Sequence, residues 1–95
     1  MAESRWKSSA RPLHVRRWGD EAVIYDDYAG ATHYLIPLAT AIWSHVQAQG
    51  SASIAELSRH LSQLPDIMVA TAGPARIEEV LGELRRLELI ESEPN

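Results

Sequence analysis

The chain changes its hydrophobic period at Pro37, and this change constrains the fold more than any other feature of the sequence. Before residue 37, apolar residues occur in short runs separated by the turn signals Gly19-Asp20 and Ala29-Gly30. After it, apolar residues recur every three or four positions, as on one face of an amphipathic helix. Proline fits the first turn of a helix because its missing N–H has no partner there. We therefore predict strands before this residue and helices after it.

Three short antiparallel strands and three helices follow from this pattern. The strands cover residues 13–18, 21–27 and 32–36. The first helix ends at Gly50, and the second begins with the capping box Ser53-Ile54-Ala55-Glu56 and ends at Pro65. The third opens at Gly73-Pro74 after a linker, residues 65–73, whose apolar content indicates that part of it packs against the domain. The predicted fold class is α+β, a three-stranded antiparallel β-meander followed by a three-helix winged-helix-like bundle.

A chain of 95 residues has room for one domain. We expect a flexible N-terminal tail over residues 1–12, a single domain over 13–91 and a frayed C-terminus over 92–95. Trp6 is unusual in such a tail, because a lone tryptophan in a polar segment can dock onto another surface. The sequence has no cysteine, no secretory h-region and no apolar run near the ~20 residues that span a bilayer. A soluble, cytoplasmic protein is expected.

The residues that could carry catalysis form no convincing site. His14, His33, His45 and His60 lack metal-ligand spacing, and there is no glycine-rich phosphate loop. If the second hairpin turns at Ala29-Gly30, Asp26 lies opposite His33, as a cross-strand ionic contact or as a base with its orienting group. No nucleophile accompanies that pair. We therefore expect no enzyme activity, no metal and no cofactor.

The charge of the chain is unevenly distributed and bears on the choice between two kinds of partner. Residues 1–17 carry five basic residues against one acidic residue, whereas the rest of the chain has a net charge of −8. Three helices with strands also describe a winged-helix DNA-binding protein, and this is the alternative function. Its recognition helix would be basic. The third predicted helix instead carries Glu78, Glu79, Glu83 and Glu88 against three arginines.

Several segments resemble the PqqD-like family, the peptide-binding domains also called RiPP recognition elements. The resemblance covers residues 13–91. Its motifs are Trp18–Asp26, Gly30–Leu35, Pro37–Ala39, Ile54–Leu57 and Leu84–Ile90. The first two are similar to a subgroup of peptide chaperones from a system that includes a kinase related to HPr kinase.

This resemblance implies a non-catalytic peptide chaperone in natural product biosynthesis. It would capture a precursor or leader peptide by β-strand addition and present it to a modifying enzyme. The kinase related to HPr kinase is one candidate for that enzyme. The implied groove lies between the third strand and the third helix, and no nucleic acid or membrane is expected as a partner. Its residues would be Thr32, His33, Tyr34, Leu35, Ile36, Arg76, Ile77, Val80, Leu81 and Leu84. Each residue of the helical stripe could instead belong to the core.

Overall fold

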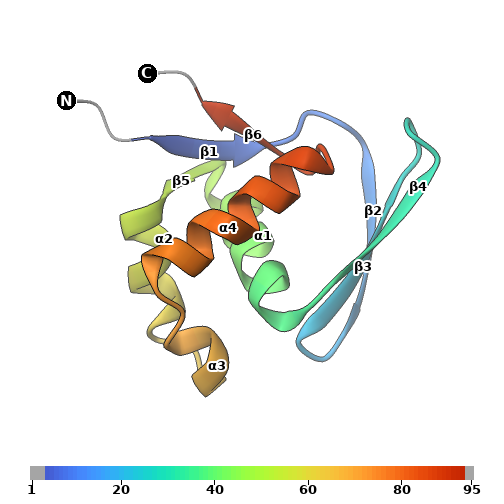
Figure 1. The fold of residues 1–95 in the computed structure, drawn as a ribbon. Helices are drawn as coiled ribbons and strands as arrows, with labels where there is room; N and C mark the ends of the chain where they lie inside the picture. Colours follow the sequence, from blue (N-terminus) through green and yellow to red (C-terminus); the bar gives the residue numbers. More distant parts are fainter. Residues whose placement is uncertain (1–3, 94–95) are drawn as a thin grey trace.

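The computed structural model describes residues 4–93, which form a mixed α+β structure with two small antiparallel sheets and four helices (Figure 1). One sheet pairs β2 (Leu13–Trp18), β3 (Glu21–Asp26) and β4 (Ala31–Leu35) in that order. The other has the order β5-β1-β6, with β1 (Arg5–Ser8) between β5 (Ser51–Ser53) and β6 (Ile90–Glu93). The helices are α1 (Pro37–Gln49), α2 (Ile54–Leu61), α3 (Ile67–Ala70) and α4 (Pro74–Arg86).

The predicted change of structure at Pro37 is confirmed. Strand β4 ends at Leu35, and α1 begins at Pro37 with the proline in its first turn. The capping box of α2 is also present, because Ser53 Oγ accepts from the backbone N–H of Glu56 while the Glu56 carboxylate accepts from that of Ser53. Part of the linker packs against the domain as expected: its short helix α3 buries Val69.

The ends of the chain differ from the prediction, because parts of the expected tail and of the frayed C-terminus form strands. Trp6 lies in β1 opposite Ala52 on one side and Ser92 on the other, and its side chain packs against the core. Each partner strand is far away in the sequence, so no local pattern marks the pairing. The second sheet therefore brings both ends of the described chain together. Residues 1–3, 94 and 95 of the two predicted segments lie outside the described residues.

One core fills the space between the helices and the two sheets. Helix α4 contacts both α1 and α2. Its buried side chains meet those of the other elements in a single cluster. The largest fully buried side chains from the helices are Ile42, Val46, Leu57, Leu61, Ile77, Val80, Leu81 and Leu84. The first sheet adds Ile24 and Leu35 to this cluster, and Leu89 and Ile90 extend it under the second sheet.

The register of β3 and β4 rules out the expected contact between Asp26 and His33. His33 pairs with Ile24, and Asp26 pairs with Ala31. The reason is the length of the connection: residues 27–30 all belong to the loop, instead of a two-residue turn at Ala29-Gly30. The Asp26 carboxylate is instead fully buried and accepts from the backbone N–H groups of Tyr28 and Ala29 at 3.0 and 3.2 Å.

Arg11 connects this buried carboxylate to the end of α4. Its guanidinium lies 2.7 Å from Asp26 Oδ2 and 2.6 Å from Glu88 Oε2, and it covers the ring of Tyr28 at 4.6 Å. Burial by itself would raise the pKa of Asp26. The Ala29 backbone N–H and the Arg11 guanidinium outweigh that effect and hold the pKa below its usual value.

Replacing Trp6 tests whether β1 belongs to the folded unit. Trp6→Ala should lower the free energy of unfolding by about 2–3 kcal/mol, because a half-buried indole leaves the core. Trp18→Ala is the matched control, since Trp18 is 56% exposed and its loss should cost less than about 0.5 kcal/mol. Urea unfolding followed by circular dichroism measures both. Equal stability of the two variants would contradict the assignment of β1.

The Asp26 site predicts an acid-dependent part of the stability. Because the pKa of Asp26 is lowered by folding, its ionised form stabilises the protein above the ordinary aspartate pKa. That contribution is lost as the pH falls through the lowered pKa. Asp26→Asn should therefore be less stable than the unmodified chain at neutral pH, and the difference should shrink in acid. Urea unfolding at several pH values measures it. Asp27→Asn, on an exposed neighbour that contacts His14, should show a smaller difference; a larger one would contradict this account.

Candidate functional site

Strand β4 has a free edge in the described part of the chain. It pairs with β3 on one side, and no strand within residues 4–93 pairs with its other side. Such an edge presents backbone N–H and C=O groups that another extended chain can use. Figure 1 shows β4 at the right edge of the molecule, where it continues into α1.

The two edges of this sheet differ in charge. Strand β2, at the opposite edge, carries Arg16 and Arg17 next to each other and His14 two positions before them. Strand β4 has the sequence ATHYL, without aspartate, glutamate, lysine or arginine. Charged side chains on an edge strand oppose pairing with another strand, because their charges would be desolvated or brought close to like charges. Of the two edges, β4 is therefore the one better suited to pairing.

The start of α1 limits the length of the usable edge. The carbonyl of Leu35 accepts a hydrogen bond from Thr40 Oγ1 at 3.1 Å, and the carbonyl of Ile36 accepts from the Thr40 N–H at 2.9 Å. Pro37 has no N–H to offer. The carbonyls available to a new strand therefore lie within residues 31–34, where alternate residues point away from β3.

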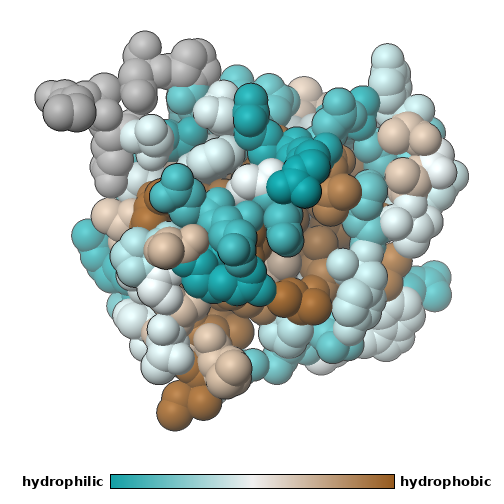
Figure 2. Space-filling model, viewed as in Figure 1, coloured by the Kyte–Doolittle hydropathy of each residue, from teal (hydrophilic) through white to brown (hydrophobic). Residues whose placement is uncertain are grey.

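A pocket of about 150 Å³ lies between β4 and α4. Leu35, Val80 and Leu84 form its floor and are almost completely buried. Tyr34 and Leu87 stand at its rim, where their side chains are 57% and 38% exposed. Figure 2 shows hydrophobic surface between the helices and this sheet. The free edge of β4 thus runs beside an apolar depression. We call the two together the β4–α4 groove, comprising residues 31–34 and the pocket.

The pocket of the groove is lined by five of the ten residues predicted from the sequence. These five residues are Tyr34, Leu35, Ile36, Val80 and Leu84. Thr32 and His33 lie on the same strand but outside the pocket.

The other predicted helix residues lie elsewhere. Ile77 and Leu81 are fully buried and belong to the core. Arg76 is exposed, forms an ion pair with Glu79, and does not line the pocket. An apolar stripe on a helix does not distinguish these cases, because residues one turn apart can face the core and the rim.

Three lining residues were not among the predicted set: Ala39, Glu83 and Leu87. Val80, Glu83, Leu84 and Leu87 follow the helical spacing i, i+3, i+4, i+7, which could have identified the last two once α4 was placed beside β4. Glu83 is the only charged residue lining the pocket, and its carboxylate makes no ion pair within residues 4–93.

A second carboxylate lies near the rim at Tyr34. The Glu21 carboxylate, followed by burial, raises the pKa of the Tyr34 phenol above its usual value. The phenol is therefore neutral at physiological pH. Residues of the groove supply apolar surface, backbone groups and acidic rim positions. This combination suits binding of an extended chain better than a reaction that needs a nucleophile.

Among residues 4–93, no group of three or more His, Asp or Glu side chains is placed to hold a metal ion. None of the helices in the same range is long and apolar enough to cross a membrane.

Comparisons with protein-family models, with curated proteins and with solved structures found no match for this chain. The resemblance to PqqD-like domains therefore stays a hypothesis based on the quoted sequence segments.

Two substitutions distinguish the buried residues at the floor of the groove from the exposed residues at its rim. Leu84→Ala should lower the free energy of unfolding by about 2–5 kcal/mol, because a buried side chain leaves a cavity in the core. Tyr34→Ala should cost less than about 1 kcal/mol, because the side chain is exposed and has only same-face contacts on the sheet. Urea unfolding measures both. If Tyr34→Ala proved the more destabilising change, the phenol would be structural and the rim assignment would be wrong.

Proposed function

We propose that this chain is a non-catalytic peptide-binding module that captures an extended peptide as an additional strand on β4. The observation that carries the proposal is an edge of β4 that has no partner strand within residues 4–93, carries no aspartate, glutamate, lysine or arginine, and lies beside an apolar pocket. Strand addition uses the backbone for affinity and pockets for alternate side chains for specificity. The β4–α4 groove offers both.

The backbone ladder alone would not supply the free energy of a micromolar complex. Four ladder hydrogen bonds would contribute about 0.5–1.5 kcal/mol each. Burying one leucine-sized side chain in the pocket would add about 1.5–3 kcal/mol. A micromolar complex needs about 8 kcal/mol. A peptide with two apolar side chains on the face toward α4 would therefore be required, in addition to its backbone.

The acidic rim predicts a charge preference for the peptide. Glu83 at the pocket and Glu21 beside Tyr34 are carboxylates, and the chain from residue 18 onward is acidic overall. A lysine or arginine next to the apolar anchor would be attracted to them, whereas an acidic residue there would be repelled. We expect preferred peptides to combine an apolar anchor with a neighbouring basic residue.

The biological partners follow from the resemblance to PqqD-like domains. The peptide would be a precursor or leader segment, and the module would hold it for a maturation enzyme, for which a kinase related to HPr kinase is one candidate. In this proposal the strands and the helices α1, α2 and α4 correspond to a winged-helix-like arrangement.

A winged-helix DNA-binding function is less well supported. The exposed positions of α4 include Glu78, Glu79 and Glu83, and Arg76 is already paired with Glu79. Arg85 and Arg86 in the last turn bring α4 to three arginines against three glutamates, so the helix lacks the net positive charge expected of a recognition helix. No observation on α2 or α4 favours DNA over peptide.

The proposal can be tested with peptides selected from a displayed random library against the intact chain. Tyr34→Ala and Leu87→Ala should each weaken the selected peptides about tenfold or more, because each removes apolar contact at the pocket rim. Trp18→Ala is the matched control, an exposed aromatic on β2, and should leave affinity unchanged. Fluorescence anisotropy gives the dissociation constants.

Amide exchange with and without the selected peptide would locate its site. New protection should concentrate on residues 31–34 and on α4. If the control substitution weakened binding as much as the groove substitutions, or if protection appeared only on α2, the groove assignment would be wrong.

A further inference from the structure

A second pocket lies away from the groove and has the opposite character. Its volume is about 430 Å³, and it lies where the end of α1, strand β5, helix α2 and strand β1 meet. All eight residues that line it are polar or charged, and none of them lines the β4–α4 groove. They include two arginines and two histidines, against a single carboxylate, in a chain whose net charge is −4.

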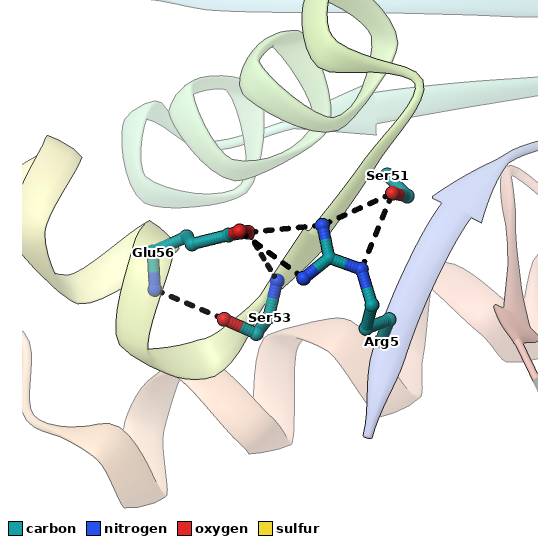
Figure 3. Close-up of polar contacts among 4 residues, drawn as sticks. All are labelled: Arg5, Ser51, Ser53 and Glu56. Carbon is teal, nitrogen blue, oxygen red and sulfur yellow. Dashed lines mark hydrogen bonds and ion pairs between the residues drawn. The ribbon is translucent and has the colours of Figure 1, made fainter. Parts of the chain in front are cut away.

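The carboxylate of this pocket is already occupied. Glu56 forms a two-point contact with Arg5, with N–O distances of 3.1 Å for both pairs of atoms, and it also accepts from the Ser53 backbone N–H (Figure 3). Ser51 Oγ accepts from Nε and Nη2 of Arg5. Hydrogen bonding to Arg5, followed by that to the Ser53 backbone, lowers the pKa of Glu56. Arg5 and Glu56 therefore contribute opposite charges that largely offset each other on this side of the pocket.

The remaining basic side chains of the pocket are Arg59, His45 and His60. Arg59, one turn further along α2, makes no hydrogen bond or ion pair through its side chain within residues 4–93. His60 follows it and stacks on His45 of α1, with ring centroids 4.1 Å apart and an angle of 21° between the rings. Neither ring has a hydrogen-bond partner among the described residues. Three cationic or protonatable side chains thus face one polar space, and the one carboxylate that lines it, Glu56, is already paired with Arg5.

We propose that this pocket binds a phosphoryl group, either free phosphate or a phosphorylated side chain, between Arg59 and the His45–His60 pair. Arg59 supplies a permanent charge and a planar set of N–H donors, which suit phosphate oxygens. Each histidine supplies an additional donor once it is protonated. The amide of Gln49 lines the same space and can donate to a third oxygen.

Protonation of the histidine pair is the step that couples anion binding to pH. Burial and the neighbouring His60 lower the pKa of His45, whereas Glu56 opposes this shift. The groups that face the pair are Arg5 from β1 and Glu56 and Arg59 from α2. A bound dianion adds negative charge beside the rings, so it favours their protonated form. Phosphate also takes up a proton as the pH falls through its second ionisation, so the affinity has to be expressed for the dianion concentration. On that scale, binding should tighten as the pH falls, by up to about tenfold per pH unit for each proton that the histidine pair takes up.

The test is a titration of the intact chain with inorganic phosphate at constant ionic strength and in the presence of a chelator. The ring proton resonances of His45 and His60 in NMR spectra report binding directly. We expect saturable shifts of both resonances, a higher pKa for His45 in phosphate, and tighter binding of the phosphate dianion at pH 6 than at pH 7.5. A short phosphoserine peptide titrated in parallel distinguishes the sources: tighter binding of the peptide than of phosphate would identify a phosphorylated side chain.

Two variants and a matched control decide whether the pocket is responsible. Arg59→Gln and His60→Gln should each weaken phosphate binding fivefold or more while the amide spectrum keeps its dispersion. Arg76→Gln removes an exposed arginine that lies outside the pocket and should leave binding unchanged. Absence of saturable histidine shifts, equal weakening in Arg76→Gln, or undiminished binding in both pocket variants would overturn the proposal. None of these results depends on peptide binding in the β4–α4 groove.

Discussion

The buried stripe of α4 is the constraint on which the rest of this structure depends. Ile77, Val80, Leu81 and Leu84 are all within a few per cent of complete burial and join α1, α2 and the first sheet in one core. Because these side chains already fill the core, they cannot also swing out to meet a ligand. Binding at this helix must therefore use its edge, where Glu83 and Leu87 remain accessible. Val80 and Leu84 connect the two roles, since each is at once a core residue and part of the floor of the groove.

The first sheet is constrained in the same way, because one of its faces is buried in the core. Its inner face is committed to the core through Ile24 and Leu35, and α1 starts two residues after Leu35. This short connection occupies the last carbonyls of β4 but leaves the edge before them without a partner strand within residues 4–93. A free edge without charged residues favours aggregation, because the same edge of another molecule can pair with it. Capture of an extended peptide is a use that fits both the edge and the pocket beside it.

Much of the fold could be predicted from local signals in the sequence. The change of period at Pro37 and the capping box at Ser53 placed the helices, because both act within one or two turns. The second sheet could not be predicted, since β1 is defined by pairing with segments far away in the sequence. The length of the loop at residues 27–30 was likewise not predicted. It sets a register in which Asp26 pairs with Arg11 and not, as expected, with His33. For the site, the strand residues were predictable from the sequence. The helix residues were not, because only the position of α4 relative to β4 shows that Val80 and Leu84 line the pocket while Ile77 and Leu81 lie in the core. Nothing in the spacing of His45 and His60 indicated that their rings would stack.

The central claim is that a peptide joins β4 as an additional strand, and replacement of single peptide N–H groups by N-methyl groups tests this most directly. In an antiparallel or parallel ladder, a strand with one neighbour uses the N–H groups of alternate residues only. N-methylation along a selected peptide should therefore weaken binding at every second position and be tolerated at the positions between. A uniform loss, or a loss confined to one anchor residue, would contradict strand addition even if the peptide occupied the groove.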